Sequence, residues 1–190
     1  VLDRPANLVA DLAFLLKPDG SSKEISSAVE WIDNEKSKGR SVVGVNANHI
    51  LLGDIKGKSI QDLCQIYIDV IARISEDKAY SFFLIPHDFR NEHSVGDIQL
   101  SRIILDELPQ DIKDHSIQAP IPCTASEIKF LCGNLDLVLT GRMHLAIAAL
   151  GQCTPTACIT YQGKFEGLFK HFEIDDMAIT PEEALQPSKF

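Results

Sequence analysis

The chain has 190 residues, enough for a domain with its own core, and 45% hydrophobic against 24% charged residues exclude a wholly disordered protein. Its formal net charge of −9 and its scattered basic residues argue against nucleic acid as a partner. No apolar run is long enough to span a bilayer, so we expect no transmembrane segment.

The start of the chain and its cysteines bear on its origin. The first residue is Val1 rather than Met, which favours a piece of a longer polypeptide. We expect residues 1–24 to form a lead-in or interdomain segment and residues 25–190 to form one domain. The five cysteines show neither C-x-x-C spacing nor a Cys/His cluster. Buried free thiols in a reducing, cytoplasmic location explain them better than a zinc site, so no metal is expected.

Helical and strand patterns alternate along most of the chain. The predicted helices cover residues 26–38, 59–75, 95–108, 126–132, 142–150 and 164–171, with one more turn from residue 180. The predicted strands cover residues 41–46, 80–86, 117–121, 135–140 and 156–160. The strands are continuous apolar runs, which is typical of a parallel sheet covered on both faces. We therefore expect an α/β fold, a doubly wound Rossmann-like parallel sheet with helices on both faces.

In such a sheet, ligands bind beyond the carboxyl ends of the strands. Polar or ionisable residues gather in the loops that follow four predicted strands, at 46–49, 86–90, 140–144 and 160–164. No Gly-rich dinucleotide fingerprint, P-loop, G-x-S-x-G or H-E-x-x-H motif is present in the sequence. We therefore look for the site in these loops and disfavour NAD binding.

The loop at 140–144 carries the clearest chemistry. Thr140 can cap a helix, and Gly141 lets the backbone approach a ligand closely. Arg142 and His144 follow in the first helical turn, where backbone N–H groups favour an anion. Arg142 can bind a carboxylate or phosphate bidentately, and His144 can donate to an oxygen or transfer a proton. The alternative is that Arg142 pairs with a nearby Asp and His144 is a core histidine.

The neighbouring loops supply further substrate-binding candidates. His87 precedes Asp88, which fits either a histidine oriented by a carboxylate or a loop that caps the next helix. Lys164 begins the last predicted helix and can neutralise a phosphate or remain solvated. Asn46 lies at the end of the first predicted strand. Three further histidines form no constellation and are expected to be structural or on the surface: His93, His115 and His171.

Several of these stretches resemble the C-terminal half of the polysaccharide pyruvyl transferase family. The most specific is T-G-R-M-H-L-A-I-A-A-L-G at 140–151, which resembles the family's R-M-H helix and is followed, as there, by a Pro-led strand. Tyr161 and Lys164 resemble its Tyr-x-x-Lys pattern, and residues 10–16, 42–46 and 84–88 resemble other segments in the same order. The chain departs from the family at Thr140-Gly141, often Ser-Ser or Ser-x, and at Gln162-Gly163, more usually Ser-Pro.

The resemblance implies a two-domain, GT-B-like enzyme with its cleft between two Rossmann-like halves, of which this chain is the C-terminal one. Such an enzyme transfers a pyruvyl group from phosphoenolpyruvate to a sugar as a ketal, releasing phosphate, in the biosynthesis of surface polysaccharides such as exopolysaccharide. By this resemblance Arg142 and His144 bind phosphoenolpyruvate or act at its reacting carbon, with His144 as the proton donor. His87 and Lys164 would support them.

The resemblance also implies the partners. Phosphoenolpyruvate is the donor substrate, no cofactor is expected, and the acceptor is a sugar or a lipid-linked glycan. The absent N-terminal domain would complete the cleft, so this chain alone is expected to be inactive. Two alternatives remain open: a GT-B-type glycosyltransferase that uses a nucleotide-sugar, against which the R-M-H pattern argues, and a non-catalytic homologue that acts as a binding domain.

Overall fold

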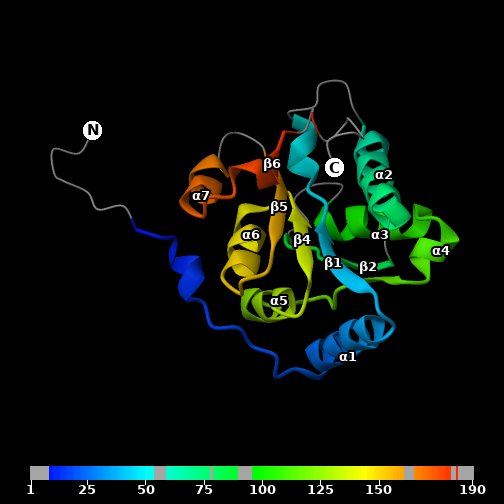
Figure 1. The fold of residues 1–190 in the computed structure, drawn as a ribbon, viewed down its shortest axis with the longest axis horizontal. Helices are drawn as coiled ribbons and strands as arrows, with labels where there is room; N and C mark the ends of the chain where they lie inside the picture. Colours follow the sequence, from blue (N-terminus) through cyan, green and yellow to red (C-terminus); the bar gives the residue numbers. More distant parts are fainter. Residues whose placement is uncertain are drawn as a thin grey trace.

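The sheet at the centre of the molecule has six strands, all parallel, in the order β3-β2-β1-β4-β5-β6 (Figure 1). The structure is a computed structural model that describes residues 9–53, 59–77, 79–89, 96–160, 165–180 and 183. Its strands are β1 (Ser41–Asn46), β2 (Tyr80–Leu84), β3 (Ser116–Gln118), β4 (Leu137–Thr140), β5 (Thr156–Ile159) and β6 (Ala178–Ile179). The strand order reverses between the neighbours β1 and β4, as in a doubly wound Rossmann-like sheet.

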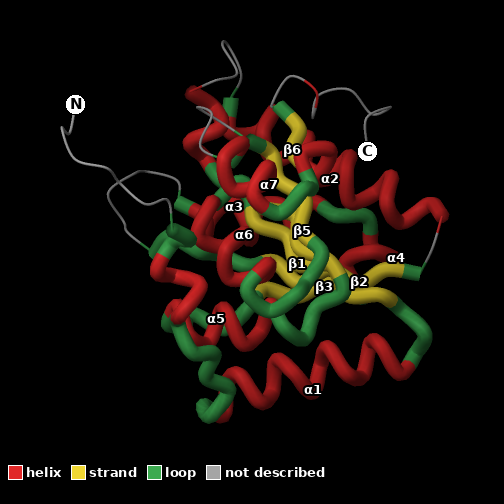
Figure 2. Tube along the Cα trace, turned by 60° about the vertical axis from the view of Figure 1, so that its left-hand side comes forward, coloured by secondary structure: helices red, strands yellow, loops and turns green. Residues whose placement is uncertain are grey.

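Helices cover both faces of the sheet, so the predicted α/β fold class is confirmed (Figure 2). They are α1 (Lys23–Ser37), α2 (Ile60–Asp77), α3 (Asp97–Glu107), α4 (Gln110–Lys113), α5 (Ala125–Cys132), α6 (Met143–Leu150) and α7 (Glu166–His171). Val42 belongs to the core cluster of α1, α5 and α6, and Val43 to the cluster of α2, α3 and α7. This alternation follows from the two-residue period of a strand.

All the helices and strands expected from the sequence are present, and the differences lie at short elements. The third strand ends at Gln118 instead of residue 121, because Pro120 and Pro122 have no N–H for the ladder. The helix α4 and the strand β6 were not predicted, since four and two residues are too short for a periodic pattern. Thr180 and Glu183 exchange the bonds of a capping box, as expected of a helical turn there.

The lead-in segment before α1 is packed on the domain. Its 3-10 helix, Leu12–Leu15, contacts α6. Lys129 on α5 is 2% exposed, and its ammonium donates to the carbonyl oxygen of Phe14 at 2.8 Å. The ring of Phe14 lies 5.5 Å from that of Phe172, centroid to centroid. A domain boundary after residue 24 stays a prediction.

A buried carboxylate joins the segments at the amino end of the sheet. Glu35 on α1 is 2% exposed. Its Oε2 accepts a hydrogen bond from Ser81 Oγ at 2.8 Å and lies 2.8 Å from His115 Nδ1. Lys38 Nζ donates to Oε1, and Arg40 Nε lies 3.6 Å from Oε2. We call Glu35, Lys38, Arg40, Ser81 and His115 the amino-end cluster.

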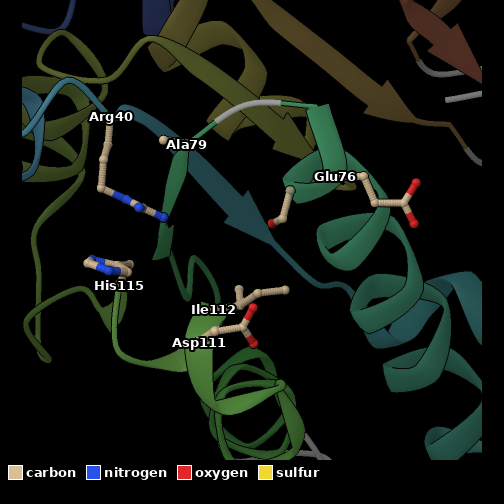
Figure 3. A pocket seen from close by; sticks show the side chains of 7 residues that line it. Arg40, Glu76, Ala79, Asp111, Ile112 and His115 are labelled. Carbon is tan, nitrogen blue, oxygen red and sulfur yellow. The ribbon is translucent and has the colours of Figure 1, made fainter.

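Two residues of the amino-end cluster, Arg40 and His115, line an open polar cavity of about 550 Å³. Figure 3 shows Arg40 and His115 on one side of it and Glu76 and Asp111 on the other. Arg40 also donates from Nη2 to the carbonyl oxygen of Tyr80 and from Nε to the hydroxyl of the cluster's serine, at 2.8 Å. The contact of 2.8 Å between His115 Nδ1 and Glu35 Oε2 agrees with the structural role expected for His115.

All five cysteines are free, and four of them are buried. Burial raises the pKa of Cys64 and Cys123 to about 11 and that of Cys132 to about 12, so these thiols stay protonated at neutral pH. Cys153 is the exposed one. None of the helices in the described residues is long and apolar enough to cross a membrane.

Candidate functional site

The loops after β1 and β4 meet at the point where the strand order reverses. Asn46 and Thr140 are register partners at the carboxyl ends of these strands, and the Thr140 hydroxyl donates to Asn46 Oδ1 at 3.2 Å. One step further on, Asn48 Nδ2 donates to the carbonyl oxygen of Gly141 at 2.9 Å. Open α/β sheets bind ligands in the crevice at this place. The sheet therefore brings together three of the predicted substrate-binding candidates: Asn46, Thr140 and Gly141.

Asp97, a residue that the sequence analysis missed, ties three loops together. It is the first residue of α3 and is fully buried. Its Oδ2 accepts hydrogen bonds from Asn46 Nδ2 at 3.1 Å and from the backbone N–H groups of His87 and Asp88 at 3.2 and 3.1 Å. Arg142 donates to both of its oxygens, from Nη2 at 2.7 Å and from Nε at 3.2 Å. We call these residues, with Thr140, Gly141 and His144, the carboxyl-end site.

The alternative reading of Arg142, in which it pairs with a nearby Asp, is confirmed by its contact with Asp97. Its side chain is 10% exposed. The Nε and Nη2 donors face Asp97, whereas Nη1 lies 3.4 Å from Asp88 Oδ2. A guanidinium has five N–H donors, so the pairing with Asp97 leaves the opposite edge of the group toward Asp88.

Thr140 positions the start of α6 without capping it. The N-cap residue of α6 is Arg142, and Thr140 Oγ1 accepts the backbone N–H of Arg142 at 2.9 Å. The prediction that Thr140 caps the helix was therefore wrong by two residues. Its hydroxyl is fully buried and also bonded to Asn46, so it fixes the angle at which the chain enters α6.

His144 is exposed in the first turn of α6, so the alternative of a core histidine is wrong. Within the described ranges, no hydrogen bond to its ring is formed. The charge of His144 acts on His87 and lowers the pKa of that histidine. His144 is thus accessible beside Arg142, as a residue that meets a ligand has to be.

His87 is half-buried and neutral at pH 7. Burial lowers its pKa to about 4, although the charge of Asp97 acts in the opposite direction. Arg142 and His144 lower the pKa further, because a second cation beside them is unfavourable. The helix α3 begins at Asp97 with Gly96 as N-cap, so neither His87 nor its neighbour caps it. At neutral pH His87 offers a hydrogen bond and no charge.

Gly141 is needed for contact between loops. A Cβ built at this position would lie 3.0 Å from Asn48 Cβ and 3.4 Å from Leu51 Cδ1. The first distance is shorter than ordinary van der Waals contact, so a side chain would push the loop after β1 away. The segment that approaches Gly141 closely is thus this loop, and the approach of a ligand to Gly141 stays a prediction.

A second missed residue lies beneath the site. Tyr67 on α2 is fully buried, and its Oη has no hydrogen bond of normal geometry among the described residues. Burial raises the pKa of its phenol; the Asn48 backbone and the charge of Arg142 oppose that rise, whereas Asp97 and Cys158 add to it. Tyr67 is thus a protonated phenol close to the Asp97–Arg142 pair. Nothing in the apolar pattern of α2 distinguishes it from a core aromatic residue.

Lys164 lies outside the described residues, as do Tyr161 and Arg90. In the parts of the chain that the structure describes, no three His, Cys, Asp or Glu side chains are grouped so as to hold a metal ion. Asp97 could have been found from the sequence by extending the strand-end rule to the first residue of each following helix, because that residue also lies at the carboxyl edge of the sheet.

Comparison with known proteins adds one match. The family model of the polysaccharide pyruvyl transferases matches residues 2–163 of the chain. The chain belongs to this family. All of the carboxyl-end site lies within the matched residues of this pyruvyl transferase family member, while α7 and β6 lie beyond them. No curated protein and no solved structure matched the chain.

Proposed function

We propose that this chain is the C-terminal domain of a pyruvyl transferase that uses phosphoenolpyruvate and forms a ketal on a sugar. The observation that carries the proposal is the position of Arg142, at the N-cap of α6 beyond the carboxyl ends of β1 and β4, with His144 exposed beside it. A guanidinium and a helix N-terminus together suit a ligand that bears phosphate and carboxylate groups. Family membership supplies the transferase chemistry.

In the proposed reaction, two hydroxyl oxygens of the acceptor sugar form bonds to C2 of phosphoenolpyruvate, and the bond from C2 to the phosphate oxygen breaks. C3 takes up a proton and becomes a methyl group. His144 gives that proton and regains one from an acceptor hydroxyl, and the second hydroxyl proton leaves with the phosphate. An accessible imidazole suits this task because its ordinary pKa lies near neutrality.

The other residues of the carboxyl-end site orient the substrate in this proposal. Asp97 holds one edge of the Arg142 guanidinium, so the other edge and the first backbone N–H groups of α6 take the anionic groups. His87, neutral at pH 7, contributes a hydrogen bond. Lys164 adds a positive charge. A sugar or lipid-linked glycan is bound across the cleft by the N-terminal half, in a cytoplasmic, GT-B-like enzyme without a cofactor.

Calorimetry on the 190-residue chain separates this function from its alternatives. We expect phosphoenolpyruvate to release heat on binding and UDP-glucose to release none. Binding of UDP-glucose alone would favour a nucleotide-sugar glycosyltransferase. Binding of neither ligand would favour a non-catalytic domain.

The proton-donor role is tested by His144→Gln in the full-length protein that contains this domain. General acid catalysis is worth about 10²–10⁴-fold, so phosphate release in the presence of acceptor should fall by at least about 100-fold. His171→Gln is the matched control, because His171 is also exposed but lies at the end of α7. Equal loss in both variants, or in neither, would contradict the assignment.

A further inference from the structure

The charges of the carboxyl-end site do not suit an anionic ligand as the site stands. Two carboxylates face one guanidinium: Asp97 holds the Nε and Nη2 donors, and Asp88 Oδ2 lies 3.4 Å from Nη1. His87 adds no positive charge at neutral pH, because its pKa is lowered to about 4. Among the described residues, Asp88, Asp97 and Arg142 therefore sum to one negative charge. A phosphate or carboxylate that approached Arg142 would meet like charge.

The two carboxylates are held in different ways. Asp97 is 0% exposed and accepts hydrogen bonds from three loops, so its loss would leave the Nε and Nη2 donors of the buried Arg142 without their acceptor. The side chain of Asp88 is 17% exposed, and its contact with Nη1 is longer than the contact of 2.7 Å between Asp97 and Nη2. Asp88 thus makes the weaker and more accessible of the two contacts.

The edge of the Arg142 guanidinium that does not face Asp97 is therefore next to the Asp88 carboxylate, at the place where a ligand anion has to bind. We propose that Asp88 occupies the position of the ligand's anionic group, and that phosphoenolpyruvate displaces the Asp88 carboxylate from Arg142 when it binds. This inference rests on the proposed function and assigns Asp88 as the residue that sets the threshold for anion binding. Asp97 keeps the guanidinium in place throughout, so the exchange changes one edge of Arg142 only.

The exchange has a quantitative consequence. When a side chain of the protein occupies a site most of the time, the apparent affinity of a ligand for that site is its intrinsic affinity multiplied by the fraction of time in which the site is free. Displacing Asp88 costs the same whichever anion replaces it. Removing the Asp88 charge should therefore tighten the binding of different anions by a similar factor.

The test is a calorimetric titration of phosphoenolpyruvate and of inorganic phosphate into wild-type chain and Asp88→Asn. The Asp88→Asn chain should bind both probes at least about tenfold more tightly, since a like-charge contact in a binding site is unfavourable and a tenfold change corresponds to about 1.4 kcal/mol. Asp88→Ser is a second variant without the charge and should behave alike. Asp88→Glu keeps the charge and should not tighten binding. Asp111 is exposed on α4 and provides the control. Asp111→Asn changes the net charge by the same amount as Asp88→Asn and should leave the affinities for both probes within about twofold of the wild-type values.

The direction in which Asp88→Asn changes the two affinities tests the proposal. Weaker binding in Asp88→Asn would make Asp88 a ligand contact, and unchanged binding would mean that it does not compete, so either result overturns the proposal. Equal tightening in Asp111→Asn would also overturn it, because the effect would then come from net charge. If wild type and Asp88→Asn both bind no phosphoenolpyruvate, the proposed function fails and this inference fails with it. Wild-type binding that is lost in Arg142→Lys but unaltered in Asp88→Asn would overturn this inference alone.

Discussion

The two ends of the sheet each contain a buried carboxylate beside an arginine, but the two arrangements differ. At the amino end, Glu35 is bound by side chains from α1 and from the segments that enter β1, β2 and β3. At the carboxyl end, Asp97 is bound by Arg142 and by groups of the loops that leave β1 and β2. Glu35 thus joins segments at the border of the core, whereas Asp97 holds together loops that carry an exposed histidine, His144.

The difference shows in which groups remain available to a ligand. Arg40 donates to Ser81 and to a backbone carbonyl and lies near Glu35, and the cavity beside it also contains Glu76 and Asp111. The guanidinium of Arg142 keeps one edge free of Asp97, next to an accessible His144. A buried ion pair is thus no sign of a site by itself. The groups that the pair leaves exposed, here one edge of the Arg142 guanidinium and His144, indicate a ligand site more clearly.

The largest effect is expected for Asp97→Asn. The substitution removes the closer of the two carboxylates that face the buried Arg142, and breaking a buried pair costs on the order of 3 kcal/mol. The free energy of unfolding in urea should fall by that amount, with loss of phosphoenolpyruvate binding. A variant as stable as wild type would contradict the role of Asp97 in holding the three loops.

Glu35→Gln should weaken the fold at the other end of the sheet and leave ligand binding unchanged. Burial alone would raise the pKa of Glu35, but hydrogen bonds from Lys38, Ser81 and His115 outweigh it and lower the pKa to about 2. Because the folded-state pKa lies below the unfolded value, this stabilisation is complete above about pH 4.5 and is lost as the pH falls toward 2.

The measurement is urea unfolding of wild type and Glu35→Gln at pH 5 and pH 3. The variant should be less stable by about 2 kcal/mol at pH 5, and the gap should narrow at pH 3. A gap that widens as the pH falls would contradict the assignment. Loss of phosphoenolpyruvate binding in Glu35→Gln would contradict the claim that only the carboxyl end of the sheet binds the ligand.

A smaller effect is expected for Gly141→Ala, which pushes apart the loops after β1 and β4. The added Cβ would lie 3.0 Å from Asn48 Cβ, and overpacking of this kind costs about 1–2 kcal/mol. Gly167→Ala on α7 is the control, since a Cβ there meets nothing within 4 Å. Unfolding and phosphoenolpyruvate titrations should separate the two variants. Equal behaviour would show that the loops tolerate the movement.

The sequence predicted the fold well because its strands are apolar runs bounded by helical patterns. It also placed Asn46 and Thr140 in loops at the carboxyl ends of parallel strands, which share one edge of the sheet, but the pairing of β1 with β4 that makes them neighbours came from the structure. The partner of Arg142 was missed, because only the loops after the strands were considered and not the first residues of the helices that follow them. Asp97 lies 45 residues earlier in the chain, and its role depends on the direction of a side chain at a helix start. Glu35 was missed for the same reason, because its partners come from three separate elements.

The central claim is that the carboxyl end of the sheet, and not the amino end, binds phosphoenolpyruvate. It is tested most directly by titrating phosphoenolpyruvate into Arg142→Lys and Arg40→Lys chains. Lysine keeps the charge at both buried pairs but cannot bind two oxygens in a fixed plane. We expect binding to weaken by at least about tenfold in Arg142→Lys and to stay at the wild-type level in Arg40→Lys. Unchanged binding in Arg142→Lys, or equal loss in Arg40→Lys, would contradict the account.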